Sequence, residues 1–184
     1  MSFTFQDIDK DLKDGQNMGG IPQVVYFGFH KDVETWPSRP ENPSNVADLG
    51  KLTGSVVMKA GTNMFKLYLT DDTGELEMEP VGEKDGKSFV MHLRLFTPGL
   101  HDKVLGFMNA SKNENLVFIV PDNNGFHYLM GDELRPATYE GADDVAGTSK
   151  ETAGRRGMSM HFSYKTANLY EYTGDIPVAD ESPA

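Results

Sequence analysis

The chain has 184 residues, of which 38% are hydrophobic, enough for one domain with a core and too few for two independent domains. With 17 Lys and Arg against 28 Asp and Glu, its net charge is −11, which argues against sequestering nucleic acid or adhering to an anionic membrane as the main task. Its lack of cysteine excludes disulfides, thiolate nucleophiles, iron–sulfur clusters and cysteine zinc sites, and its apolar runs are far shorter than the ~20 residues of a membrane helix.

The N-terminal part of the chain predicts an arm, a buried strand and a long loop. Residues 1–20 are acidic with few apolar residues, so they form a predicted N-terminal arm leading into a single domain over residues 21–175. Residues 24–29 are β-branched and aromatic, which is typical of a well-buried strand. Three prolines spaced by three make residues 37–45 a predicted surface loop.

An alternation of period two begins after residue 54 and predicts two short strands, over 55–59 and 63–70. A strong turn signal over residues 71–74 then leads into 75–81, so that 63–70 and 75–81 are predicted to pair as a hairpin. The second strand places three carboxylates on one face, at Glu75, Glu77 and Glu79. Pro80 predicts that this strand lies at a sheet edge.

A strand and a helix are predicted next to each other. Residues 88–95 alternate as a strand. Thr97 and Pro98 have the residue types of an N-cap and a first helical position, and apolar residues follow on one helical face. The sequence therefore predicts one helix over about residues 98–111.

The C-terminal half predicts further strands and a tail. Residues 116–120 and 126–130 flank a hairpin loop, 134–139 are a candidate strand, and 158–164 alternate cleanly. Residues 176–184 are a predicted flexible acidic tail. The predicted fold is mainly β, an antiparallel β-sandwich or flattened barrel with one α-helix, long loops and an N-terminal arm.

The sequence contains no convincing catalytic pattern, so the chain is predicted not to be an enzyme, with no catalytic, cofactor or metal site. No nucleophile elbow and no phosphate-binding loop is present. The five histidines lie far apart in the sequence, at His30, His92, His101, His127 and His161. Four of them are in or beside predicted strands, so they are interpreted as polar positions of half-exposed strands.

Two other classes stay open as alternatives. One is a monomeric ligand- or carbohydrate-binding β-sandwich with an aromatic cleft near Trp36, Tyr26 or Tyr170. The other is a hydrolase whose carboxylates and histidines, such as His92 and His161, come together only in three dimensions.

The last third of the chain resembles a known family. A basic, Gly-containing turn over residues 150–157 leads into the alternating strand 158–164 and then into residues 170–177. This order resembles the closing segment of tail-tube and related virion proteins of long-tailed bacteriophages. The resemblance implies stacked, hexameric rings whose inner strands close into a continuous β-barrel. It also implies a virion tail assembled in the host cytoplasm, with partners that are copies of the chain itself and other tail proteins such as a tape-measure and a terminator. DNA would pass through without specific binding, and no membrane is involved. A terminator, adaptor or baseplate ring is the alternative within this class.

Under this hypothesis, the acidic and the basic residues lie on different surfaces of the subunit. The carboxylates Glu75, Glu77 and Glu79 are candidates for the lumen lining, because a face rich in carboxylates repels DNA phosphates. The basic residues Lys150, Arg155 and Arg156 are candidates for a subunit or ring contact. Their acidic partners on a neighbour would be the turn containing Asp71 and Asp72 or the N-terminal arm. The simpler alternative is that the basic loop balances acidic residues of its own chain.

Overall fold

Two four-stranded antiparallel sheets, packed face to face, form the structure, which is a computed structural model describing residues 4–8, 18–141, 146–148 and 154–179. The first sheet has the order β4-β1-β7-β8 and consists of β1 (Val24–Phe29), β4 (Phe65–Tyr68), β7 (Leu116–Pro121) and β8 (His127–Met130). The second has the order β5-β6-β10-β9 and consists of β5 (Glu75–Val81), β6 (Ser88–Pro98), β9 (Thr138–Tyr139) and β10 (Gly157–Thr166). These sheets confirm the predicted mainly-β, sandwich-like fold.

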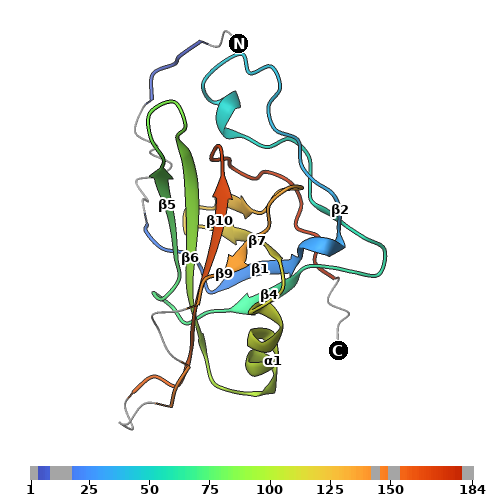
Figure 1. The fold of residues 1–184 in the computed structure, drawn as a ribbon, viewed down its shortest axis with the longest axis vertical. Coiled ribbons are helices and arrows are strands. Elements are labelled where there is room, and N and C mark those ends of the chain that lie inside the picture. Colours follow the sequence, from blue (N-terminus) through green and yellow to red (C-terminus); the bar gives the residue numbers. More distant parts are fainter. Residues whose placement is uncertain (1–3, 9–17, 142–145, 149–153, 180–184) are drawn as a thin grey trace.

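Smaller elements complete the chain. A two-stranded sheet joins β2 (Val33–Thr35) to β3 (Val57–Met58), and the described residues contain one α-helix, α1 (Asp102–Ser111). Short 3-10 turns occupy His30–Asp32 and Asp48–Gly50. In Figure 1 the long strands β5, β6 and β10 run along the long axis, the strands of the first sheet run across them, and α1 lies beyond β4. No helix within the described residues could cross a membrane.

β7 is buried on both of its faces, because the first sheet has a core on each side. Phe118 contributes to the cluster between the two sheets, whereas Val117 and Ile119 contribute to a second cluster. That second cluster lies under the segment that contains β2 and β3 and under the C-terminal segment, which adds Tyr172. Burial on both faces explains why this strand reads as a continuous apolar run in the sequence.

The predicted hairpin of 63–70 with 75–81 is wrong. β4 pairs with β1 in the first sheet, whereas β5 pairs with β6 in the second, so the turn between them passes from one sheet to the other. Gly74 in this turn lies so close to Ile21 that a Cβ would be 2.3 Å from its side chain. The predicted edge position of the strand containing Pro80 is confirmed, because β5 ends its sheet.

The helix begins later than predicted. Thr97 and Pro98 belong to β6, where they pair with Met158 and Gly157 of β10, and the helix begins at Asp102. The long ladder with β10 extends β6 through Pro98, and the chain then turns at Gly99, whose φ is +83°. A strong local capping signal is therefore overridden by strand pairing.

The ends of the chain are held more closely than predicted. Val178 forms a bridge with Met64, and Ile176 packs against the second cluster, so the packed chain continues beyond residue 175, where the tail was predicted to begin. In the predicted arm, Thr4 is bridged to Asn45 of the Pro-rich loop. The remainder of the arm that lies at residues 1–3 and 9–17 is outside the described residues.

Candidate functional site

The outward face of the second sheet carries the predicted acidic residues. Because Leu76 and Met78 of β5 turn toward the core, the alternate carboxylates project outward. Their side chains are well exposed, with exposed fractions of 64% for Glu75, 52% for Glu77 and 58% for Glu79. The strand therefore presents a row of carboxylates on a sheet face that points away from the core.

Arg94 on the neighbouring strand partly neutralises this row. It lies directly opposite Glu75 in the β5–β6 ladder, and its Nη1 is 2.7 Å from Glu77 Oε2 and 3.4 Å from Glu75 Oε2. The hydrogen bond from Arg94 lowers the pKa of Glu77, and its positive charge adds to this effect. The sequence analysis missed this pairing, although the alternation of Arg94 with the buried Leu93 and Leu95 already indicated its outward direction.

The outward face remains acidic when its strands are taken together. It carries four carboxylates and three permanently charged cations, namely Glu75, Glu77, Glu79, Glu140, Arg94, Lys165 and, over the Phe96 ring at one end, Arg155. The excess of negative charge is smaller than the β5 sequence alone predicts. The charge is nevertheless of the sign expected for a surface that repels phosphates.

Two histidines that are far apart in the sequence meet on the same face. His92 Nδ1 is 2.9 Å from His161 Nε2, and Glu79 Oε2 is 3.6 Å from His92 Nε2. A hydrogen bond between two imidazoles needs one nitrogen as donor and the other as acceptor, so at least one ring is neutral. The convergence envisaged for the hydrolase alternative is therefore present for these two side chains.

Ser163 lies opposite His92 in the ladder, but its hydroxyl donates to Glu140 and not to a histidine. Within the described residues, no three acidic or histidine side chains come together as a metal site.

The predicted subunit-contact residues lie at one end of this sheet. The guanidinium of Arg155 is 5.9 Å from the centre of the Phe96 ring. Thr70 N donates to Phe96 O at 3.1 Å, which brings the turn containing Asp71 and Asp72 to the same end of β6. Within the described part of the chain, no ion pair joins these aspartates to Arg155 or to Arg156. Lys150, the other predicted contact residue, lies outside the described residues.

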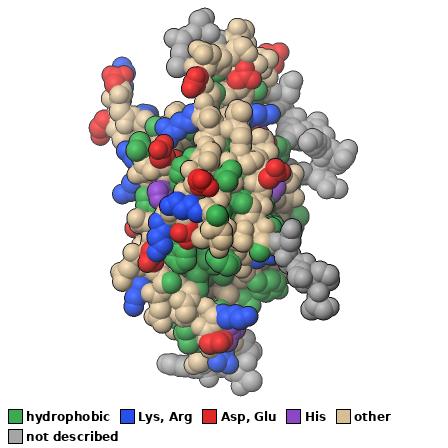
Figure 2. Space-filling view, turned by 90° about the vertical axis from the view of Figure 1, so that its right-hand side faces the viewer, with side chains coloured by type: hydrophobic (Ala, Val, Ile, Leu, Met, Phe, Trp, Pro, Cys, Tyr) green, Lys and Arg blue, Asp and Glu red, His purple; other side chains and the backbone are tan. Residues whose placement is uncertain are grey.

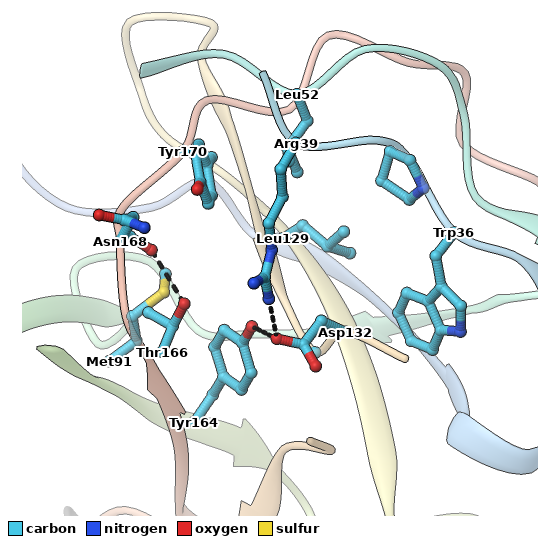
Figure 3. A pocket seen from close by; sticks show the side chains of 12 residues that line it. Trp36, Arg39, Leu52, Met91, Leu129, Asp132, Tyr164, Thr166, Asn168 and Tyr170 are labelled. Atoms are coloured by element: carbon cyan, nitrogen blue, oxygen red, sulfur yellow. Dashed lines mark hydrogen bonds and ion pairs between the residues drawn. The ribbon is translucent and has the colours of Figure 1, made fainter. Parts of the chain in front are cut away.

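A small cavity lies near Trp36 and Tyr170, where the alternative of a ligand-binding module predicts an aromatic cleft (Figure 3). Its volume is about 30 Å³, and a buried water molecule needs roughly 10–15 Å³. The cavity therefore has room for two or three water molecules and none for a sugar ring. Tyr26, the third aromatic named for that cleft, packs against the second cluster as Trp36 and Tyr170 do, but it is not among the residues that line the cavity.

Asp132 is the main polar residue beside this cavity, and no motif marks it in the sequence. Its Oδ2 accepts hydrogen bonds from Arg39 Nη2 at 2.6 Å and from the Tyr164 hydroxyl at 2.8 Å, as Figure 3 shows. Its backbone carbonyl accepts a hydrogen bond from His30 Nε2 at 2.6 Å. These bonds join the Pro-rich loop, the end of β1 and β10, so the role of Asp132 is to hold three segments together.

No family model, no curated protein and no solved structure matches the chain.

Proposed function

We propose that the chain is a structural subunit that assembles with copies of itself into rings, and that stacked rings form a phage tail tube through which DNA passes. The observation that carries this proposal is the second sheet, whose outward face and two edges, β5 and β9, are available for contacts within the described residues. All of its neighbouring strands are antiparallel. Because it has four strands, β5 and β9 run in opposite directions, and β9 of one copy can join β5 of the next in antiparallel pairing.

The charge of the sheet supports the same proposal. If the edges join around a ring, one face of the second sheet lines the lumen, and the face available for this is the one with Glu75, Glu77 and Glu79. Its acidic excess disfavours binding of phosphates, as a passage for DNA requires. The ion pairs with Arg94 hold the carboxylates in place without removing that excess.

Exposed apolar side chains also favour self-association. The described residues that are large, apolar and exposed are Phe5, Ile8, Met18, Val57, Phe65, Tyr68, Leu105 and Leu134. Figure 2 shows hydrophobic side chains gathered over the lower half of one face, at the height of β4 and α1 in Figure 1. Patches of this kind commonly mark protein contacts.

Electron microscopy and sedimentation over a concentration series test the proposal. We expect rings or tubes above a threshold concentration and a folded single copy below it. A strictly monomeric particle at every concentration would contradict the proposal.

The basic contact is tested by the double variant Arg155→Glu, Arg156→Glu. We expect it to remain folded and to assemble poorly, because reversed charges cannot meet the Asp71–Asp72 turn of a neighbour. The matched control is Lys103→Glu, Lys112→Glu, which reverses two exposed charges near the two ends of α1. Unchanged assembly of the Arg155, Arg156 variant would remove this contact from the proposal.

A further inference from the structure

A groove runs beside edge strand β5 of the second sheet. It has a volume of about 510 Å³ and lies between β5, residues 18–21 and the β7–β8 loop. Apolar side chains line it, from Met18, Leu76, Met78 and Tyr128, and carboxylates lie at Glu75 and Asp122. The groove therefore combines apolar side chains with polar groups in similar measure, and its charged residues are acidic.

The walls of the groove are fixed by specific contacts. Met18 N donates to Asn124 Oδ1, and Asn124 Nδ2 donates to Met18 O, both at 3.1 Å. Asn123 Nδ2 donates to Gly19 O at 2.8 Å, and the close contact of Ile21 with Gly74 fastens this segment to the start of β5. The groove is a built feature, so an incoming group meets a surface that is already ordered.

The opposite flank of the sandwich presents an apolar side chain on a rigid turn. Leu134 is 84% exposed and lies just before β9, the other edge of the second sheet. Its backbone N–H and that of Arg135 donate to Asp132 Oδ1 at 2.8 and 2.9 Å. The backbones of Asp132 and Arg135 are also hydrogen-bonded to each other. The turn therefore holds the apolar side chain of Leu134 in contact with water.

We propose that the Leu134 turn of one copy seats in the groove beside β5 of the next copy. This inference rests on the proposed ring assembly and names its lateral contact. The two features lie at opposite edges of one sheet, as a head-to-tail ring requires. Seating Leu134 among Met18, Leu76 and Met78 buries apolar surface on both copies, which is the main favourable term in association.

One pair of charges at the two sites is complementary, that of Arg135 with Asp122, whereas Glu133 on the other side of Leu134 is exposed and acidic. Arg135, next to Leu134, is exposed and forms no ion pair among the described residues. Among the described residues, the donors to the Asp122 carboxylate at the groove are neutral: the backbone N–H groups of Asn124 and Phe126 and the hydroxyl of Tyr128. A cation from a neighbour would complete the environment of this carboxylate. The occupant that the groove fits is thus a second copy of this chain.

Cross-linking between two single-cysteine variants tests the contact directly, because the chain has no cysteine of its own. Leu134→Cys and Met18→Cys proteins are mixed under assembly conditions and treated with a short bifunctional thiol reagent. We expect cross-linked pairs that contain one copy of each variant. The control pair is Leu105→Cys with Met18→Cys, since Leu105 is exposed on α1, away from the β9 edge.

The outcomes separate this inference from the proposed function. Assembly with cross-linking no greater than in the control pair would overturn the Leu134 contact and leave ring formation standing. Absence of any assembly would overturn the proposed function and this contact together. Assembly with selective cross-linking supports both.

Substitutions give a second, independent measurement. We expect Leu134→Asp to raise the concentration needed for assembly by about tenfold or more. The conservative variant Leu134→Met should assemble at the same concentration as the wild type. Arg135→Glu should also weaken assembly, whereas the neighbouring change Glu133→Gln should not. Because Leu134 is mostly exposed, its substitution should leave the thermal unfolding of the single copy unchanged. Normal assembly of Leu134→Asp would overturn the contact.

Discussion

Asp132 shows how much of this fold depends on one partly buried carboxylate. It receives the guanidinium of Arg39, the hydroxyl of Tyr164 and two backbone N–H groups. Hydrogen bonds to a charged acceptor are stronger than those between neutral groups. No motif surrounds this residue in the sequence, because its partners come from three distant segments. Residues of this kind are found only when the fold is known.

Tyr164→Phe is predicted to lower the free energy of unfolding by about 1–2 kcal/mol at neutral pH, because it removes the hydrogen bond to Asp132. Burial, and then the hydrogen bond to Asp132, raise the pKa of Tyr164 above its ordinary value of 10.0. The folded state therefore holds the phenolic proton more tightly than the unfolded state. This contribution is fully present below pH 10.0 and is lost as the pH rises toward the folded-state pKa.

Denaturant unfolding of both proteins from pH 7 to pH 11 measures this effect. We expect the stability of the wild type to fall more steeply than that of Tyr164→Phe at the alkaline end. Parallel losses in the two proteins would mean that Tyr164 does not govern the alkaline transition.

Thr97→Val is predicted to stabilise the protein by about 1 kcal/mol, measured by thermal or denaturant unfolding. The Thr97 hydroxyl is buried in β6 and has no hydrogen-bond partner among the described residues. Valine has nearly the same shape and removes the unsatisfied group. A loss of stability would show that the hydroxyl has a partner after all. The sequence suggested an N-cap here because Thr97 is followed by Pro98, but its backbone pairs with Met158 instead.

At the scale of elements, the sequence predicted what depends on local pattern and missed what depends on pairing. The strand β1 and the hairpin of β7 and β8 were predictable from β-branched runs and a turn signal, although four of the six residues of β1 are only partly buried. The partner of β4 was not, because a turn between two sheets has the same residue types as a hairpin turn. For the same reason, the carboxylates of β5 were found and their partner Arg94 was missed.

Two glycine substitutions should have opposite effects on their elements. Gly106 lies exposed inside α1 with open space around it, so Gly106→Ala should stabilise the protein by about 0.5–1 kcal/mol. Gly157 is packed against β6, and an added Cβ would be 2.5 Å from Thr97 O, so Gly157→Ala should destabilise it by about 1–3 kcal/mol. Thermal unfolding of both variants checks the signs. Equal effects would contradict the close approach of β10 to β6.

At the scale of the whole molecule, the net charge of −11 sets long-range repulsion between copies against the proposed local contacts. The total charge was known from composition alone. The arrangement of the charge was only partly predictable. The acidic strand face and the basic segment containing Arg155 can be recognised in the sequence, but their neighbours in space, Arg94 and Phe96, cannot.

Added salt should distinguish the long-range repulsion between copies from the local charge contact made by Arg155 and Arg156. The screening length falls from about 10 Å at 0.1 M salt to about 3 Å at 1 M. We expect the assembly deficit of Arg155→Glu, Arg156→Glu relative to the wild type to shrink as salt rises, measured by sedimentation. A deficit that is constant across this range would indicate a change of shape rather than of charge.

The burial of β7 on both faces also determines how the domain unfolds. Phe118 belongs to the cluster between the sheets and Ile119 to the second cluster. Because β7 is part of both clusters, unfolding of one cluster also disrupts the other. Calorimetry should therefore record a single cooperative transition despite the two separate clusters. The backbone amides of β7 should be the last to exchange with deuterium, because they become exposed only when the whole domain unfolds.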